Sequence, residues 1–359
     1  MVRVVIIGAG PAGINCAQTL AKSLTPANDV EVVVLERSKF FFHAVGTPRA
    51  YTDASFVKKL FIPYDHAIPT AAAPFVKIMR ATATKVSVEP SEVSYRKVRD
   101  EDDQEETDEH TLAFDYLIIA TGSTYTVPIK QDPRTNSRAD TEKKLAEVHE
   151  KIANADRILV VGGGAVGCEV AGDIAHTYPN KSVTILEARE KLISGNNLRD
   201  KFYSYLDHSL AKLKIKVILG ERLEERLTGN LDASLITDRG FIKVNDQLQL
   251  EGAKYSHIFC LGDASNHATP KLAYWAGQQG SFLATELVAV LRGKQSAFTK
   301  PFPRVEVEAL LLPLGSCGGV SQLPVWGGVV VGDKLTWLVK ARDMFAGKTW
   351  SSLGATMPN

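Results

Sequence analysis

The sequence predicts an α/β fold with two Rossmann-like dinucleotide-binding units and a small α+β region at its C-terminal end. One pattern occurs twice: an apolar strand runs into a glycine-rich turn that opens a helix, first in VVIIGAGPAG (residues 4–13) and again in VVGGGAVGCE (residues 160–169). After each turn, a second apolar strand ends in an acidic residue. The first glycines of the two turns, Gly8 and Gly162, lie 154 residues apart (162 minus 8), which is a domain-sized period rather than that of a solenoid.

The first turn has the spacing G-x-G-x-x-G, with Gly8, Gly10 and Gly13. The first glycine permits a tight bend, the second lets a pyrophosphate approach the backbone, and the third allows the helix to pack closely on the strand. The helix N-terminus offers free N–H groups and a partial positive charge to the phosphates. Glu36 ends the next strand, 23 residues after Gly13, where a carboxylate can accept hydrogen bonds from an adenosine ribose.

The second turn repeats this spacing with Gly162, Gly164 and Gly167, and Glu187 follows 20 residues after the last glycine. This spacing is typical of NAD ribose recognition. A carboxylate repels a 2′-phosphate, so we expect a preference for NADH, although Arg189 nearby weakens that preference and leaves NADPH open. Two dinucleotide sites on one chain predict a resident flavin and a nicotinamide donor. A duplicated turn that no longer binds nucleotide stays open as the alternative.

Two more apolar strands, in FDYLIIATGS (114–123) and IFCLGDAS (258–265), end in small residues that let the chain turn beneath a bound dinucleotide. Asp263 can accept hydrogen bonds from the ribityl hydroxyls of a flavin. A helix is predicted from about residue 270 to 291, with Thr269 as its N-cap and Gly293 at its end. Its positive end would point at the pyrimidine side of the flavin, where negative charge develops on reduction.

Composition and charge limit the class of protein. The 359 residues are 45% hydrophobic and 23% charged, as in soluble proteins of two or three domains. A net charge of +1 gives no field that favours nucleic acid. The cysteines are widely spaced and form no CxxC pair, which argues against a redox disulfide and for a reducing, cytoplasmic compartment: Cys16, Cys168, Cys260 and Cys317. No apolar run approaches the roughly 18 residues of a spanning helix, and a strand follows Met1 directly, so we expect no signal or transit peptide.

The remaining stretches complete the predicted organisation. The acidic run at 100–109 reads as a solvated hairpin tip, residues 140–155 as an amphipathic helix, and residues 325–339 (VWGGVVVGDKLTWLV) as strand-like. We expect three domains: an FAD-binding domain of residues 1–125 and 240–300, an NAD(P)H-binding domain of residues 126–239, and a C-terminal α+β region of residues 301–359.

The motifs GAGPAG, ATGST, GGGAVGCEVA and LGDAS, in this order, resemble the two-dinucleotide flavoprotein reductases with a glutathione-reductase-like fold. Three further segments, HAVGTPRA (43–50), TPKLAYWAGQQ (269–279) and KARDMFAGKTW (340–350), are similar to the apoptosis-inducing-factor-like group. That group includes ferroptosis-suppressor-like, FAD-dependent NAD(P)H oxidoreductases. The resemblance runs from about residue 4 to 350 and implies FAD and NAD(P)H as cofactors and a quinone-like acceptor.

The resemblance also implies which residues act. It places FAD against Gly8, Gly10, Pro11, Ala12, Gly13, Glu36, Arg37, Arg49, Val86, Ala120, Thr121, Gly122, Asp263, Lys271 and Ala273. It places NAD(P)H against Gly162, Gly164, Val166, Gly167 and Glu187. Catalytic roles are expected for Lys271, beside the flavin, and for Glu169, which would face the nicotinamide cleft. A simple helix-surface carboxylate stays open as the alternative for Glu169, and no metal ligands are expected.

The chain departs from the family pattern after ILGERLEERLTGN (218–230). Relatives have a β-meander and a further strand there, whereas here only LDASLITDRG (231–240) follows before Phe241. The NAD(P)H-binding unit is therefore predicted to be truncated near residues 230–240 and to lack its last strand, which would leave the neighbouring strand with an unpaired edge.

Three functions fit these observations to different degrees. The first is an oxidoreductase that passes hydride from NAD(P)H to flavin and then two electrons to a quinone-like acceptor, with ascorbyl radical or an iron–sulfur protein as other acceptors. The second is a flavin-binding protein whose degenerate NAD unit leaves it acting through a partner. The third, a nucleic-acid-binding death effector, disagrees with the charge balance. The tail at 333–350 mixes aromatic and basic residues, which suits either peripheral contact with a membrane or lipid surface or packing on the FAD domain.

Overall fold

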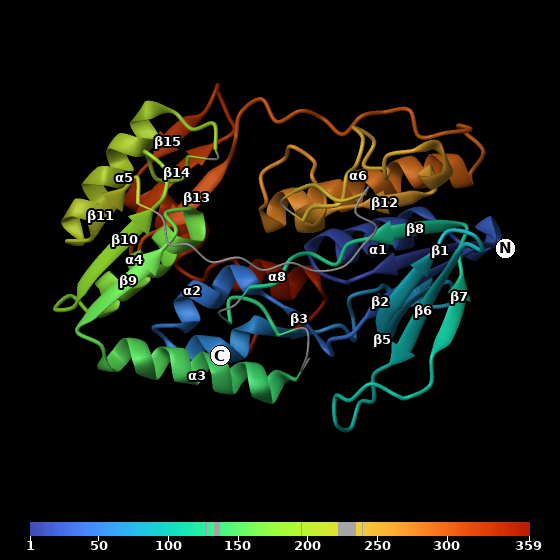
Figure 1. Cartoon of the computed structure of the whole chain (residues 1–359), viewed down its shortest axis with the longest axis horizontal. Helices are drawn as coiled ribbons and strands as arrows, with labels where there is room; N and C mark the ends of the chain where they lie inside the picture. The colour runs from blue at the N-terminus through green and yellow to red at the C-terminus, as the bar shows by residue number, and fades with distance from the viewer. Residues whose placement is uncertain (126–127, 133–136, 195, 222–234, 239) are drawn as a thin grey trace.

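The computed structural model describes residues 1–125, 128–132, 137–194, 196–221, 235–238 and 240–359. Figure 1 shows the largest sheet on one side of the molecule and a smaller parallel sheet on the other, with the C-terminal strands beside the smaller sheet.

The largest sheet contains strands from both ends of the predicted FAD-binding domain. Its order is β12-β8-β1-β2-β5-β6-β7. The strands are β1 (Val2–Ile7), β2 (Val30–Glu36), β5 (Val76–Ser87), β6 (Glu92–Lys97), β7 (His110–Ala113), β8 (Tyr116–Ile119) and β12 (Ile258–Cys260). The strands from β12 to β5 run parallel, whereas β6 and β7 continue the sheet antiparallel. The hairpin between β6 and β7 contains the acidic run, as predicted.

The smaller parallel sheet has the order β11-β10-β9 among the described residues. It consists of β9 (Arg157–Val161), β10 (Ser182–Glu187) and β11 (Lys216–Leu219), connected by α4 (Ala165–Thr177) and α5 (Asp200–Lys212). Helix α3 (Arg138–Asn154) precedes β9 and matches the predicted amphipathic helix. The strand–turn–helix pattern of the first sheet is thus repeated, and the predicted α/β class with two Rossmann-like units is confirmed.

The C-terminal region adds an antiparallel sheet of β13 (Leu310–Pro313), β14 (Gly319–Leu323) and β15 (Val329–Val331). Two short helices follow, α7 (Asp333–Thr336) and α8 (Ala346–Ser352), with a π-helical turn at Trp337–Ala341 after α7. A strand pair, β3 (Phe40–Phe42) and β4 (Phe61–Pro63), and helix α2 (Thr47–Ala50) lie between β2 and β5 in sequence.

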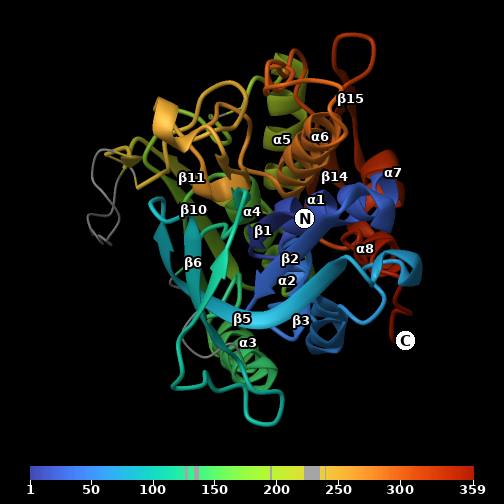
Figure 2. The ribbon, with the colours of Figure 1, turned by 90° about the vertical axis from the view of Figure 1, so that its right-hand side faces the viewer.

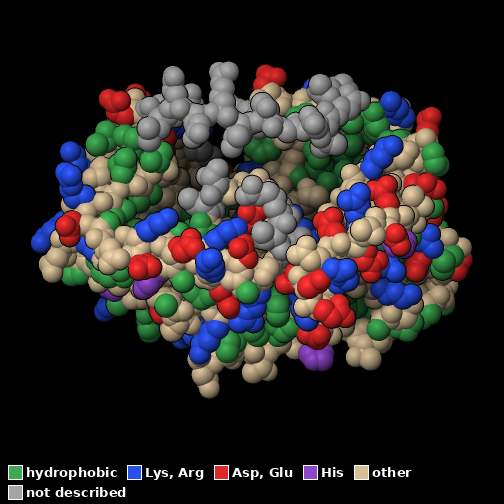
Figure 3. Space-filling model, turned by 60° about the horizontal axis from the view of Figure 1, so that its bottom comes forward, with side chains coloured by type: hydrophobic (Ala, Val, Ile, Leu, Met, Phe, Trp, Pro, Cys, Tyr) green, Lys and Arg blue, Asp and Glu red, His purple; other side chains and the backbone are tan. Residues whose placement is uncertain are grey.

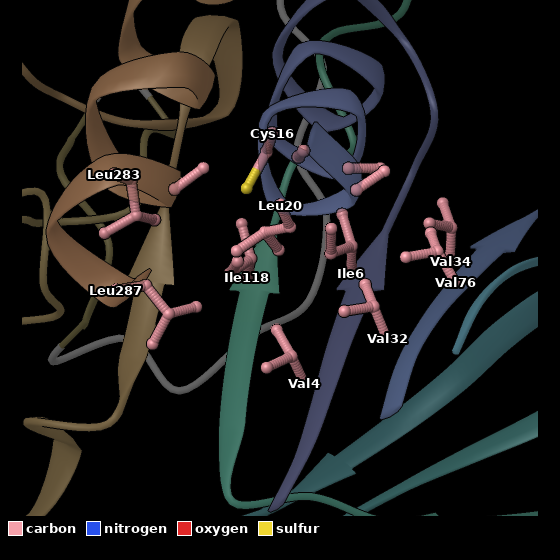
Figure 4. Packing of buried hydrophobic residues seen from close by; sticks show 14 of the residues in the cluster. Val4, Ile6, Cys16, Leu20, Val32, Val34, Val76, Ile118, Leu283 and Leu287 are labelled. Atoms are coloured by element: carbon pink, nitrogen blue, oxygen red, sulfur yellow. The ribbon is translucent and has the colours of Figure 1, made fainter. Parts of the chain in front are cut away.

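The core of the first unit lies between its sheet and two helices, α1 (Pro11–Ser23) and α6 (Ala273–Leu291). In Figure 4, Leu283 and Leu287 from α6 and Leu20 from α1 point toward strand residues such as Ile6 and Ile118. These side chains are almost fully buried, and β1 and β2 are buried on both faces, as expected for parallel strands covered by helices.

Helices α1 and α6 lie side by side, as Figure 2 shows, because a glycine allows their backbones to approach. A Cβ atom at Gly280 would lie 2.1 Å from the carbonyl oxygen of Ala12. At Gly277 the nearest atom to such a Cβ is the side-chain amide of Asn15, at 3.1 Å.

We therefore expect Gly280→Ala to lower the thermal unfolding midpoint by about 5 °C or more, although alanine is the better helix former. Gly277→Ala is the matched control, since a flexible side chain can move aside; equal midpoints for the two variants would contradict the close packing.

Two local predictions are wrong. Helix α6 begins at Ala273 with Leu272 as its N-cap, so Thr269 lies outside it and instead accepts a hydrogen bond from Gln279 at 2.6 Å. Of the strand-like stretch 325–339, only β15 is a strand, and the part after Gly332 is helical. Four apolar residues of this helical part are exposed on its outer face: Leu335, Trp337, Leu338 and Val339.

Candidate functional site

The first glycine turn connects β1 to α1 against the end of β8. Gly8 has φ +96°, in the region that favours glycine, and a Cβ there would lie 2.6 Å from the carbonyl oxygen of Ala120. A Cβ at Gly13 would lie 1.9 Å from the carbonyl oxygen of Gly8. The packing of the chain itself therefore requires both of these glycines.

Gly10 differs from them, because no contact in the described part of the chain requires a glycine there. Its φ of −65° and ψ of −170° are extended values that any residue adopts, and no described atom lies within 4 Å of a Cβ placed on it. The open space lies at the N-terminus of α1, where Pro11 begins the helix. This position fits a group that must approach the backbone and its free N–H groups, as the pyrophosphate of FAD does.

Glu36 joins the turn to the end of β2. Its carboxylate accepts hydrogen bonds from the backbone N–H of Ala9 at 2.6 Å and of Ser38 at 2.8 Å. Burial raises the pKa of Glu36, and these hydrogen bonds oppose that rise. The carboxylate keeps lone pairs that can accept hydrogen bonds from ribose hydroxyls.

We expect Glu36→Ala to weaken FAD retention, because it removes both backbone hydrogen bonds as well as the proposed ribose acceptor. The ratio of flavin to protein absorbance after gel filtration measures the effect. Glu31→Ala is the matched control: Glu31 also lies on β2 but pairs with Arg3 at the other end of the strand. Normal flavin content in the Glu36 variant would count against the assignment.

The second turn reproduces the first in detail. Gly162 has φ +102°, and a Cβ at Gly167 would lie 1.9 Å from the carbonyl oxygen of Gly162. Gly164 is extended, and no atom of the residues that the structure describes lies within 4 Å of a Cβ placed on it. Glu187 accepts hydrogen bonds from the backbone N–H of Gly163 at 2.6 Å and of Arg189 at 3.0 Å. The repeat predicted from the sequence therefore extends to individual hydrogen bonds.

The two turns differ in their surroundings. A Cβ at Gly8 would meet the end of β8, whereas among the described residues a Cβ at Gly162 would meet nothing within 4 Å. Strand β1 pairs with β2 and β8, but among the described residues β9 pairs only with β10. Leu159 and Val161 on β9 are 54% and 58% exposed. The truncation is predicted near residues 230–240. Residues 222–234 and 239 lie outside the described part of the chain, so the missing strand stays a prediction.

Asp263 follows β12 and lies close to the first turn. A Cβ at its neighbour Gly262 would lie 3.6 Å from the Cβ of Ala12 at the start of α1. The carboxylate of Asp263 accepts hydrogen bonds from Lys130 and from Ser123, both at 3.0 Å. The structure thus brings Asp263 close to the N-terminal end of α1.

Lys271 is held by backbone carbonyls. Its ammonium group donates to the carbonyl oxygens of Ser265 at 2.7 Å and His267 at 3.0 Å, and burial lowers its pKa. These bonds fix the loop that leads from β12 into α6, whose first residue is Ala273.

A buried pair of ion pairs joins the two units to the C-terminal region. Glu169 on α4 is 4% exposed and accepts a hydrogen bond from the Lys340 ammonium at 2.6 Å. One turn further along α4, Asp173 accepts one from Arg49 of α2 at 2.8 Å. Burial raises the pKa of both carboxyl groups, and the cation beside each opposes the rise. Glu169 is therefore a buried, paired acid and not a helix-surface carboxylate.

Of the other residues predicted to contact FAD, some lie near the first turn and one does not. Ala120 packs against Gly8 of the first turn through its carbonyl group. Thr121 and Gly122 follow it, and Gly122 has φ +72°. Arg37 follows Glu36, and burial lowers its pKa. Val86 lies six residues, roughly 20 Å of strand, beyond Arg80, the residue of β5 that pairs with Glu36. The structure therefore does not bring Val86 to the turn.

The cationic partners at the site were missed by sequence reasoning. Lys340 belongs to the tail whose basic residues are described above only as a group, and neither Lys130 nor the acidic residue Asp173 is predicted as a site residue. The sequence signal for Lys340 is its spacing, because Thr336 and Lys340 are polar residues four positions apart, which share one face of a helix. The structure buries both, while the apolar residues between them are exposed.

The two turns and the sheets around them define a two-dinucleotide oxidoreductase. The chain belongs to the pyridine nucleotide-disulphide oxidoreductase family, whose model matches residues 2–237, and its cofactors are FAD and NAD(P)H. Apoptosis-inducing factor homolog B of Dictyostelium discoideum is 27% identical and covers 99% of this chain and 98% of its own. Ferroptosis suppressor protein 1 of Taeniopygia guttata is 28% identical, covering 100% and 97%. The sulfide:quinone oxidoreductase of Aquifex aeolicus has the same fold, with a TM-score of 0.73 at 14% identity, over 99% of this chain and 92% of that one.

This chain is shorter than the relatives that it matches over almost its whole length. The match to the Dictyostelium protein extends over 408 positions, whereas this chain has 359 residues. At least 49 positions (408 minus 359) of that relative therefore have no counterpart in this chain.

Proposed function

We propose that this protein passes electrons from NAD(P)H through FAD to a quinone-like acceptor. The observation that supports this most is the repeated turn. Gly10 and Gly164 each leave open space at a helix N-terminus, although neither the backbone conformation nor a contact with another described residue requires a glycine there. FAD, when bound, accepts hydride from the nicotinamide and passes two electrons on. Residues 1–125 and 240–300 would hold FAD, and residues 126–239 would hold NAD(P)H.

The thiols of the chain support direct transfer to the acceptor. All four cysteines are free, and burial raises the pKa of three of them to about 12: Cys16, Cys168 and Cys260. Such thiols stay protonated and unreactive, so a dithiol relay does not fit. A lipid-soluble quinone would be collected at a membrane surface, with contact through the C-terminal region.

The chain's own residues would orient and stabilise the two dinucleotides. Glu36 and Glu187 would accept hydrogen bonds from the two adenosine riboses, which favours NADH over NADPH at the second turn. The N-terminus of α6 would favour negative charge on the pyrimidine side of the flavin, with Lys271 holding the preceding loop. Glu169, kept in place by Lys340, would line the nicotinamide side.

A second candidate is a flavin-binding protein that NADH no longer reduces. It is favoured by the open surroundings of Gly162 and the exposed apolar residues of β9. Nucleic-acid binding is not favoured: on the face shown in Figure 3, positive and negative side chains are interspersed, and the described side chains there form no basic patch.

Anaerobic reduction separates the two candidates. Purified protein with bound FAD is mixed with NADH in the absence of oxygen, and the flavin absorbance is followed. Bleaching within seconds, reversed by a short-chain quinone, supports the oxidoreductase. A yellow protein that NADH leaves unchanged supports the binding protein, and reoxidation by ascorbyl radical or an iron–sulfur protein, but not by quinone, would replace the proposed acceptor.

A further inference from the structure

The helical segment at 333–341 faces its polar residues inward and its apolar residues outward. Thr336 is 0% and Lys340 9% exposed, although both are polar. The apolar residues beside them are 40–54% exposed: Leu335 at 49%, Trp337 at 40%, Leu338 at 54% and Val339 at 40%. A surface helix of a water-soluble domain normally shows the opposite arrangement.

Hydrogen bonds fix this orientation. The hydroxyl of Thr336 lies 2.8 Å from that of Ser321 on β14. The Lys340 ammonium donates to Glu169 at 2.6 Å and to the carbonyl oxygen of Leu311 at 3.0 Å. Because these polar groups are buried, the segment cannot turn its apolar row inward without leaving them unsatisfied.

The charges around the row favour an anionic surface. The two acidic residues near the row, Asp333 and Asp343, already have partners within the chain. Asp333 pairs with Lys212 and accepts a hydrogen bond from the N–H of Gly319. Asp343 accepts hydrogen bonds from the N–H groups of Phe345 and Gly347. Lys334 and Arg342, at the two ends of the row, are exposed and pair with no carboxylate among the described residues.

We infer that the apolar row Leu335, Trp337, Leu338 and Val339 is a lipid-contact surface that enters the head-group region of an anionic bilayer. A tryptophan among aliphatic residues, with cations at both ends, is the composition of interfacial helices. In Figure 2, α7 lies at the periphery of the molecule. No helix among the described residues is long and apolar enough to cross a membrane. This inference deepens the proposed function, since the same segment carries Lys340 on its inner face.

Co-sedimentation with vesicles tests the surface. The full-length flavoprotein is mixed with vesicles of phosphatidylcholine and phosphatidylserine in a two-to-one ratio, and with phosphatidylcholine alone. We expect binding to the mixed vesicles, and a dissociation constant raised about tenfold or more by the double substitution Leu335→Ser and Leu338→Ser. Leu159→Ser is the matched control, because Leu159 is equally exposed, at 54%, on β9.

Tryptophan fluorescence gives a second readout. Vesicles should shift the emission to shorter wavelength, and this shift should be lost in Trp337→Phe. The inference is overturned if wild-type protein binds neither vesicle, if the double variant binds as well as wild type, or if the row instead mediates a concentration-dependent dimer that the double variant abolishes.

The proposed function can fail separately from this inference. The double variant should reduce a water-soluble short-chain quinone at the wild-type rate, and only the reduction of a long-chain quinone embedded in vesicles should fall. Vesicle binding without any quinone reduction would contradict the proposed acceptor and leave the lipid surface supported.

Discussion

Gly10→Val is expected to yield a folded protein without FAD, whereas Gly164→Val yields a yellow protein that NADH fails to reduce. Both glycines have extended backbones and open space around a Cβ, so the chain tolerates a side chain at either position. A valine there would occupy the space through which a pyrophosphate approaches the helix N-terminus. We expect the affinity for the corresponding dinucleotide to fall by a factor of 100 or more, on the order of 3 kcal/mol, because phosphate contacts with the backbone would be lost.

The two variants control for each other. Flavin content is measured after gel filtration, reduction by NADH is followed anaerobically, and circular dichroism confirms the fold of both variants. A Gly10 variant that keeps its FAD would contradict the assignment of the first turn. If NADH reduced the Gly164 variant at the wild-type rate, the second turn would not be the binding site of NADH.

The turns could be predicted from sequence because their geometry is local. The close approach of Gly13 to the carbonyl oxygen of Gly8 lies within one strand–turn–helix unit, and the same approach recurs between Gly167 and Gly162. Backbone conformation, helix dipole and the acid at the end of the second strand all follow from residues close together in the chain.

The partners of Glu169 could not be predicted in this way. Lys340 is 171 residues distant, and their contact depends on how the C-terminal region packs against α4. The tail also combines opposite preferences: its apolar residues suggested a strand or a buried helix, and only the packing shows that Trp350 is buried while Trp337 is exposed. The predicted start of α6 was wrong because Thr269 does not cap the helix. Its hydroxyl accepts a hydrogen bond from the Gln279 side chain instead.

Lys340→Met is expected to destabilise the protein strongly near neutral pH. Glu169 would stay buried at 4% exposure without its cation, and removing one partner of a buried ion pair costs about 3–5 kcal/mol. Adding Glu169→Gln to this variant should recover much of the loss, because a neutral amide has no charge to compensate. Lys334→Met, on the exposed side of the same segment, is the matched control and should change the unfolding free energy by about 0.5 kcal/mol or less.

The loss should depend on pH in a direction set by Glu169. Burial raises the pKa of this carboxyl in the folded state, and removing Lys340 removes the main influence that lowers it. Between the pKa of the unfolded chain and the higher pKa of the folded variant, the folded state binds a proton that the unfolded state does not, so the free energy of unfolding falls as pH rises. Thermal unfolding should therefore show a larger deficit for Lys340→Met at pH 8 than at pH 5.5, and no such difference in the double variant. Equal deficits at both pH values would mean that Lys340 stabilises the protein by packing rather than by its charge.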